Sequence, residues 1–185
     1  MRVIAGKFKS RQLKSVDSKL TRPTTDKNKE NLFNMIGPYF EGGICLDLFG
    51  GSGGLGIEAI SRGMDELYTV DKQYKAFAIM KENFRALGID TIAHAYKMDY
   101  QKALYQFKDM ALKFDMVLLD PPYGMKINEG ILDFLNKNKM LNDDCVIVIE
   151  DLNEECIEIK EPFILKKQQS YGITTLQIIQ YRGKI

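Results

Sequence analysis

Tryptophan is absent from this chain of 185 residues, which also has only one histidine, three cysteines and five prolines. The odd number of cysteines, with no Cys-x-x-Cys pair, argues against a disulfide framework, and we expect Cys45 and Cys145, which lie in apolar runs, to be buried thiols. His94 has no second ligand at metal spacing, so we expect a structural role for it and no metal site. No apolar run approaches the ~20 residues of a membrane span, and no signal-peptide core follows Met1. These features predict a cytoplasmic protein without a membrane segment.

The composition is that of a globular protein, with 45% hydrophobic and 28% charged residues. A chain of this length can bury roughly 70% of its unfolded surface and needs no covalent staples. We find no internal repeat, low-complexity segment or interdomain linker. The sequence therefore predicts a single domain over residues 1–185.

Positive charge is concentrated at the N-terminus. Residues 1–30 contain nine basic and three acidic side chains, a net charge of +6, which leaves −5 for the rest of a chain whose total is +1. This asymmetry favours a polyanionic partner reached through the N-terminus, and a solvated surface stretch is the alternative. We expect a basic N-terminal extension and helix over residues 1–37, with a hairpin or two edge strands in residues 1–15. The helix begins after the N-cap Thr25 and ends at Gly37.

Strand and helix patterns alternate along the rest of the chain. Apolar runs predict strands at 44–48, 67–70, 91–96, 114–119 and 145–149, each followed or separated by a helical pattern. The expected helices extend from the glycine cluster to Arg62, over residues 72–87, through Leu104, Phe107 and Ala111, and through Ile127, Ile131 and Leu135. This order predicts an α/β fold with a doubly wound, mostly parallel sheet and right-handed crossovers. Two strand patterns, 163–167 and 174–181, predict an antiparallel C-terminal hairpin.

The glycine cluster after the first strand is the motif around which the rest is arranged. Its spacing, Gly51-x-Gly53-x-x-Gly56, fits the nucleotide-loop fingerprint, in which glycines let the backbone approach a ligand and the helix approach the strand. A turn that needs glycine only for its geometry is the alternative. Two acids favour the ligand site: Asp47 ends the strand before the glycines, and Asp71 ends the next strand, where an acid can bind ribose hydroxyls.

Four acids follow successive strands of the expected sheet. Ligands bind beyond the carboxyl ends of parallel strands, which lie along one edge. Each acid alone is compatible with a turn or a helix cap, but all four together favour a shared crevice. The four are Asp47, Asp71, Asp99 and Asp120.

The sequence Asp120-Pro121-Pro122-Tyr123 follows the fourth strand directly. A rigid turn is its simplest interpretation, but the two prolines would also hold the Asp120 carboxylate and the Pro121 carbonyl as a fixed pair of acceptors. Such a pair suits the two hydrogens of a planar exocyclic amine on guanine, adenine or cytosine. Hydrogen bonds that favour charge on the nitrogen, with alignment to an electrophilic methyl group, would lower the barrier to methylation. Tyr123 could stack on the base.

Four stretches together resemble the bacterial 16S rRNA guanine-N2 methyltransferases of the RsmD type, which are class I S-adenosylmethionine-dependent enzymes with a Rossmann-like fold. They are MRVIAGKFKSRQL, RPTTDKNKENLFN, DLFGGSGGLGIEAISRG and FDMVLLDPPY, and the resemblance extends over essentially the whole chain. The last two are shared with many methyltransferases, whereas the first two narrow the family. The resemblance implies methylation of a guanine N2 amine in 16S rRNA, within the assembling small ribosomal subunit or in naked rRNA.

The resemblance also assigns roles to residues, with residues 43–185 as the cofactor-binding and catalytic core. It implies contacts to S-adenosyl-L-methionine from Asp47, Phe49, Gly51, Ser52, Gly53, Gly56, Asp71, Lys72, Asp99 and Tyr100. The methyl-acceptor site would consist of Asp120, Pro121, Pro122 and Tyr123, and RNA would be bound by Lys7, Arg11, Arg22 and Thr24. The family more often has alanine at the position of Gly50, so we expect a slightly looser loop here.

Other functions share parts of this pattern. A dinucleotide-dependent oxidoreductase would share the glycine loop and Asp71 but would not need the acid-Pro-Pro-Tyr sequence. A DNA adenine or cytosine amino-methyltransferase usually has a target-recognition region, for which 185 residues leave little room. A protein-glutamine methyltransferase would favour asparagine at position 120. A non-catalytic RNA-binding module is the alternative outside enzymes.

Overall fold

The computed structural model describes residues 1–16 and 25–183. Five α-helices, seven strands and one 3-10 helix are found in these residues. In chain order they are α1 (Asp26–Ile36), β1 (Ile44–Asp47), α2 (Gly54–Ser61), β2 (Glu66–Asp71), α3 (Tyr74–Leu87), β3 (Ala93–Lys97), α4 (Tyr100–Asp109), β4 (Phe114–Leu119), α5 (Asn128–Lys137), β5 (Leu141–Leu152), η1 (Asn153–Glu155), β6 (Phe163–Tyr171) and β7 (Thr174–Tyr181).

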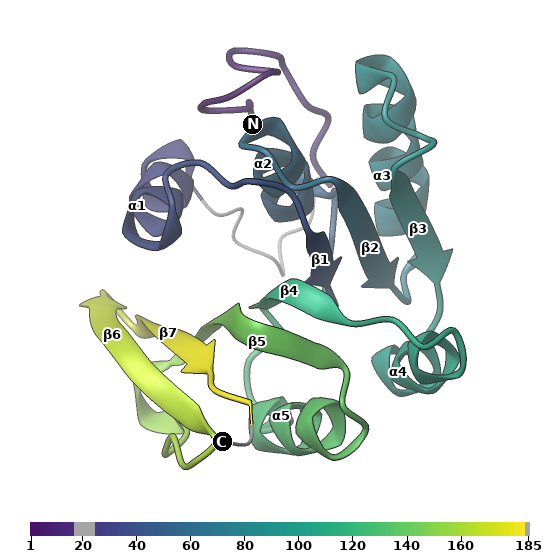
Figure 1. Cartoon of the computed structure of the whole chain (residues 1–185). Helices are drawn as coiled ribbons and strands as arrows, with labels where there is room; N and C mark the ends of the chain where they lie inside the picture. Colours follow the sequence, from purple (N-terminus) through teal and green to yellow (C-terminus); the bar gives the residue numbers. More distant parts are fainter. Residues whose placement is uncertain (17–24, 184–185) are drawn as a thin grey trace.

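The strands form one seven-stranded sheet in the order β3-β2-β1-β4-β5-β7-β6 (Figure 1). The first five strands are parallel, and β7 pairs antiparallel with both β5 and β6. This confirms the expected doubly wound α/β fold with an antiparallel C-terminal hairpin. Because β1 and β4 are neighbours and the chain leaves β1 for β2 on one side, the order reverses between β1 and β4, where such folds bind ligands.

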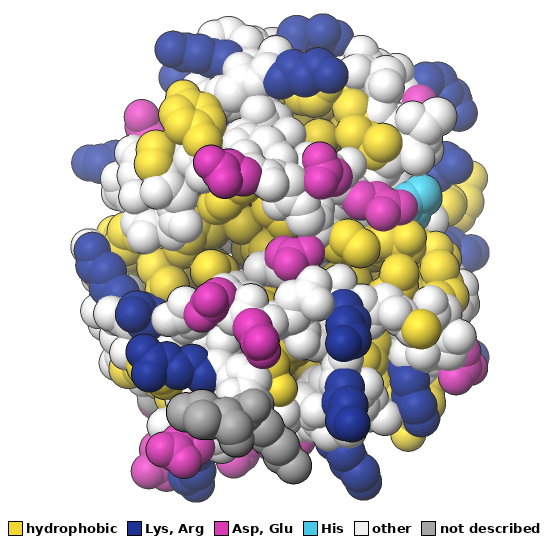
Figure 2. Space-filling view, in the orientation of Figure 1, with side chains coloured by type: hydrophobic (Ala, Val, Ile, Leu, Met, Phe, Trp, Pro, Cys, Tyr) yellow, Lys and Arg dark blue, Asp and Glu magenta, His cyan; other side chains and the backbone are white. Residues whose placement is uncertain are grey.

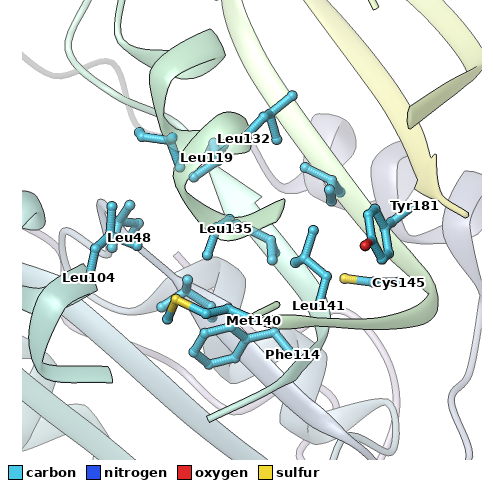
Figure 3. Close-up of a cluster of buried hydrophobic side chains, with 14 of the residues drawn as sticks. Leu48, Leu104, Phe114, Leu119, Leu132, Leu135, Met140, Leu141, Cys145 and Tyr181 are labelled. Carbon is cyan, nitrogen blue, oxygen red and sulfur yellow. The ribbon is translucent and has the colours of Figure 1, made fainter. Parts of the chain in front are cut away.

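Helices cover both faces of the sheet, with α1, α2 and α3 on one face and α4 and α5 on the other (Figure 1). Alternate residues of each strand enter different cores. On β4, Met116 and Leu118 pack with the α1–α3 side, whereas Val117 and Leu119 pack with the α4–α5 side. Figure 3 shows the second of these cores, in which Phe114 and Leu135 lie among other buried apolar side chains. The predicted buried thiols Cys45 and Cys145 are confirmed as buried.

The ends of two predicted elements are wrong. The strand expected at 145–149 extends over Leu141–Leu152, because it pairs with β4 through a bulge at one end and with β7 at the other. Residues 142–144 are polar, so a search for apolar runs does not detect the beginning of this strand. The helix expected to reach Ala111 ends at Asp109, and Ala111 has a φ of 55°.

Residues 1–16 form no strand in the sheet, so the two edge strands expected there are absent, and the alternative expectation of a hairpin agrees with the structure. A single antiparallel bridge joins Arg2 to Gln12. Helix α1 follows as predicted, with Thr25 accepting a hydrogen bond from the Asn28 amide at 3.2 Å. His94 contacts Glu66 at 2.7 Å and the ring of Tyr68, which agrees with a structural role.

The N-terminal segment is attached to α2 through a buried carboxylate. The side chain of Glu58 is fully buried, and its oxygens accept hydrogen bonds from the amides of Ile4 and Ala5 at 3.0 Å each. Arg62 donates to the same carboxylate at 2.9 Å, and the Lys29 ammonium of α1 lies 3.6 Å away. Burial lowers the pKa of Lys29, and the charge of Glu58 opposes this shift. The carboxylate therefore joins α1, α2 and the N-terminus.

Replacing this carboxylate with a neutral isostere should destabilise the protein. We expect Glu58→Gln to lower the free energy of unfolding by about 3–5 kcal/mol, because two buried cations lose their counter-charge. Urea denaturation measures the change. Glu82→Gln is the matched control: Glu82 pairs with Lys14 at 2.6 Å on the surface, and exposed pairs contribute about 1 kcal/mol or less. Equal losses in the two variants would contradict this account.

Candidate active site

Acidic side chains follow the carboxyl ends of the parallel strands. Asp47 and Asp71 are the last residues of β1 and β2, and Asp120 follows β4 directly. The charges of Asp71 and Asp120 both interact with that of Asp47, so these three acids lie together. Asp99 caps the N-terminus of α4 and accepts a hydrogen bond from the Gln101 amide at 2.8 Å. Figure 2 is drawn in the orientation of Figure 1. Across the middle of the molecule it shows acidic side chains around a hollow with an apolar floor.

Asp47 is a deeply buried carboxylate. It is 1% exposed, and neither carboxylate oxygen has a hydrogen-bond partner among the described residues. Desolvation raises the pKa of Asp47 to about 7, although the nearby amides of Gly56 and Phe49 oppose the shift. A buried carboxylate without a partner is costly in a folded protein, and a cation bound beside it would relieve that cost.

The glycine loop has the geometry that the fingerprint predicts. Gly51 has a φ of +56° and donates to the Asp71 carboxylate at 3.0 Å, and a Cβ added at this position would point into open space. Gly53 is left-handed at the start of α2. A Cβ on Gly56 would lie 2.7 Å from Leu67, so this glycine allows α2 to pack closely on β2. The loop is therefore compact on its protein side and open where a ligand could approach.

Gly50 does more than loosen this loop. A Cβ at this position would lie 2.1 Å from Oγ1 of Thr69 and 2.8 Å from the terminal methyl group of Met80. The Thr69 hydroxyl is buried and has no hydrogen-bond partner among the described residues. In this chain, Thr69 and Met80 occupy the space that an alanine side chain would need. The expectation that Gly50 only loosens the loop did not include this packing.

Asp71 holds the loop as well as the strand end. Its two carboxylate oxygens accept hydrogen bonds from the amides of Gly51 and of Gln73, at 3.0 and 2.8 Å. Burial raises its pKa, and these two amides and the charge of Lys72 oppose the shift. The Lys72 side chain is exposed beside it. The carbonyl of Ser52 accepts a hydrogen bond from Asn83 of α3 at 2.9 Å, which fixes the other side of the loop.

Two aromatic rings lie beyond the loop. The centroids of Phe49 and Tyr100 are 5.5 Å apart, and both rings pack against the α4–α5 core. Tyr100 also lines a groove of about 490 Å³ between α4 and α5. The other residues that line it are Gln101, Leu104, Tyr105, Lys126, Ile127, Gly130, Ile131 and Phe134. A flat, largely apolar ligand portion fits beside Tyr100.

The turn after β4 presents Asp120 at the same edge. Burial raises the pKa of Asp120 well above its usual value, and the charges of Glu150, Asp47 and Asp151 add to the shift. Pro121 is buried, and the Tyr123 ring is 46% exposed. The turn is anchored at its far end, where the Gly124 amide donates to Glu155 of η1 at 3.0 Å.

Sequence reasoning missed the acids at the end of β5. Glu150 and Asp151 lie beside the turn after β4, and Asp151 is 4% exposed and accepts a hydrogen bond from Nδ2 of Asn128 at 2.8 Å. The signal was present, because these acids directly follow the apolar run of residues 145–149, as the other acids follow theirs. The described residues contain no group of three His, Cys, Asp or Glu side chains that could hold a metal ion.

Basic residues of the N-terminus lie on the α2–α3 side. The backbone of Lys7 donates to the carbonyl of Ser61 at 2.7 Å, and its ammonium lies 5.3 Å from the ring centroid of Phe8. Arg11 donates to the carbonyl of Ala86 at 2.8 Å. The predicted RNA-binding residues Arg22 and Thr24 lie outside the described residues. In the described part of the chain, no helix is long and apolar enough to cross a membrane.

Comparison with known proteins gives close relatives over the whole chain. "Putative rRNA methyltransferase YlbH" of Bacillus subtilis is 43% identical over 184 residues, which are 99% of this chain and 100% of that protein. "Ribosomal RNA small subunit methyltransferase D" of Haemophilus influenzae is 30% identical, over 97% of this chain and 93% of its own. Among solved structures, "Putative methyltransferase yhhF from Escherichia coli" superposes with a TM-score of 0.86 at 26% identity, covering 100% of this chain and 99% of that one.

The model of the family described as "Conserved hypothetical protein 95" matches residues 1–180. The match includes the N-terminal segment, the glycine loop, the Asp-Pro-Pro-Tyr turn and most of the C-terminal hairpin. The chain therefore belongs to this family, that of the RsmD-type methyltransferases.

Proposed function

We propose that this chain transfers the methyl group of S-adenosyl-L-methionine to the exocyclic N2 amine of a guanine in 16S rRNA. The observation that carries the proposal is the position of Asp120, which follows the strand next to β1 and interacts electrostatically with Asp47 beside the glycine loop. A cofactor held by the loop would therefore lie next to the acceptor site. Relatives in the same family bear the names of rRNA methyltransferases, and these names support RNA as the substrate class.

The residues of the edge fit S-adenosyl-L-methionine, which supplies an electrophilic methyl group on a positively charged sulfur. The buried carboxylate of Asp47, which has no ion-pair partner among the described residues, suits the cationic methionine portion, and the open side of Gly51 admits it. Asp71 would bind the ribose hydroxyls, with Lys72 beside it. Phe49, Asp99 and Tyr100 would surround the adenine, and Ser52, Gly53 and Gly56 shape the loop.

Asp120 and the Pro121 carbonyl would accept the two hydrogens of the target amine. In this position the nitrogen would be aligned with the methyl group that the cofactor supplies, the carbon–sulfur electron pair would remain on sulfur, and Asp120 would take the proton that the nitrogen loses. Because the pKa of Asp120 is raised well above its usual value, its carboxylate is a better proton acceptor than an ordinary aspartate. Pro122 stiffens the turn, and Tyr123 would stack on the base.

The RNA would reach this site across the N-terminal segment. Lys7 is held on α2 by its backbone amide, and Arg11 is held on α3 by its guanidinium group. Arg22 and Thr24 belong to the same basic region of the sequence. These few cations allow few phosphate contacts. We therefore expect the folded RNA of an assembling small subunit to be a better substrate than naked rRNA, and we expect the enzyme to act in the cytoplasm.

Methyl transfer from labelled S-adenosyl-L-methionine tests the proposal. The label is offered in parallel to small subunits from a strain that lacks this gene, to their naked 16S rRNA and to duplex DNA. Label recovered as N2-methylguanosine from the rRNA is the expected result. Label in DNA alone would favour a DNA amino-methyltransferase instead, and cofactor binding without any transfer would favour a non-catalytic RNA-binding module.

Loss of the Asp120 carboxylate should remove turnover and largely spare cofactor binding. We expect Asp120→Ala to lower the rate of methyl transfer by about 10²–10⁴-fold, since both proton acceptance and orientation of the amine are lost. Single-turnover kinetics and cofactor titration separate the two effects. Asp109→Ala, at the exposed end of α4, is the control. Turnover that survives in Asp120→Ala would show that this role is wrong.

Ionisation of Asp47 should lower the stability of the folded protein and raise its affinity for the cofactor. The pKa of Asp47 is about 7 in the folded protein, above its unfolded value of about 4. The folded state therefore binds a proton that the unfolded state lacks between these values, and stability falls as pH rises through this window. At pH 8, Asp47→Asn should be more stable than the native protein by roughly 2–4 kcal/mol. The difference should vanish near pH 4.

The same variant should bind S-adenosyl-L-methionine more weakly. Native affinity should increase between about pH 6 and 8 as Asp47 ionises, whereas the affinity of Asp47→Asn should be flat over this range. Denaturant unfolding and calorimetric titration at several pH values measure the two effects. A variant that binds the cofactor as tightly as the native protein at pH 8 would rule out Asp47 as a contact for its cationic portion.

A further inference from the structure

Glu150 lies beside Asp120 and has no role in the reaction derived above. Leu119 of β4 pairs with Ile149 of β5 in parallel register. The next residues on the two strands are Asp120 and Glu150, so the two carboxyl groups lie side by side at the edge of the sheet. Among the charges that act on Asp120, that of Glu150 raises its pKa most.

Glu150 faces the acceptor site and not the α4–α5 core. Glu150 pairs with Leu176, and both Leu176 and Val148 pack on the α1–α3 side of the sheet. Leu118, two residues before Asp120, packs on that side as well. The neighbouring acid, Asp151, lies on the opposite side, where Asn128 binds it.

The carboxylate of Glu150 is half-buried and has no hydrogen-bond or ion-pair partner among the described residues. Burial raises its pKa, as expected for an acid near other acids. By contrast, Glu58 and Asp151, which are more deeply buried, both have hydrogen-bond donors. A half-buried acceptor next to the reacting amine is therefore available to a substrate.

We propose that Glu150 accepts a hydrogen bond from N1–H of the target guanine and thereby selects guanine over adenine and cytosine. This inference rests on the proposed function. Guanine presents three donor hydrogens along one edge, one on N1 and two on N2. Asp120 and the Pro121 carbonyl receive the two on N2, and Glu150, from the adjacent strand, receives the one on N1.

Adenine and cytosine present the opposite chemistry at this position. Their exocyclic amines lie next to a ring nitrogen that carries a lone pair and no hydrogen. An ionised carboxylate repels that lone pair, and neither group is satisfied once water is excluded. A pair of ionised acids is unfavourable without a ligand, but three guanine donors and a cationic cofactor would stabilise it. Glu150 is in this sense a specificity residue.

The test replaces the target guanine with 2,6-diaminopurine, which keeps the reactive 2-amine but converts N1 from a donor to an acceptor. Small subunits assembled with rRNA that contains either base are methylated by the native protein and by Glu150→Gln. We expect the native protein to prefer guanine by about 100-fold. We expect Glu150→Gln to reduce this preference at least about tenfold, because its amide N–H can donate to N1 of diaminopurine.

Two further variants complete the experiment. Glu150→Asp should lower the rate on guanine but keep the preference, since it remains an acceptor. Glu154→Gln, an exposed acid in η1, should change neither rate nor preference. A merely structural role for Glu150 predicts equal losses on both bases, and that result would overturn the inference. Failure of the native protein to methylate guanine would instead overturn the proposed function, and this inference with it.

Discussion

Desolvation of carboxylates at one edge of the sheet is the constraint on which this structure depends. Parallel strands bring Asp47, Asp120 and Glu150 to the same edge, and burial raises the pKa of each. Acids in such a position destabilise the folded state, because each ionised carboxylate loses its hydration and lies close to other negative charges. The cost is acceptable where a cationic ligand and a donor-rich base complete the site. The arrangement therefore favours binding of a cation before, or together with, the base.

The second buried carboxylate, that of Glu58, has its charge compensated by the groups around it. Glu58 is as buried as Asp47, but it has two backbone amides, a guanidinium group and an ammonium group around it. Asp47 precedes the glycine loop, and Glu58 is in α2, the helix that the loop begins. Glu58 holds the N-terminal segment in place, whereas Asp47 has only the nearby amides of Gly56 and Phe49 and no cation beside it. Burial alone therefore does not distinguish a structural acid from a functional one. The hydrogen-bond and ion-pair partners of the acid make that distinction.

The sequence predicted the order of elements and most of the edge, because apolar runs and the acids that follow them are local signals. Asp47, Asp71 and Asp120 lie together as the strand pattern required. Pairing between distant segments was beyond such reasoning. The full length of β5 depends on its pairing with β4 and β7. The packing of Thr69 against Gly50 likewise depends on a contact between β2 and the loop after β1 that no local pattern encodes.

The length of β5 also connects the acceptor turn to the rest of the fold. Beyond Glu150, the strand leads into η1, whose Glu155 binds the Gly124 amide at the far end of the turn. Asp151 binds Asn128, the first residue of α5, into which the same turn leads. The segment between Asp120 and α5 is thus held at two points by one neighbouring strand and its extension. A turn fixed in this way can keep the Asp120 carboxylate and the Pro121 carbonyl in position for an amine, which is the alignment that methyl transfer requires.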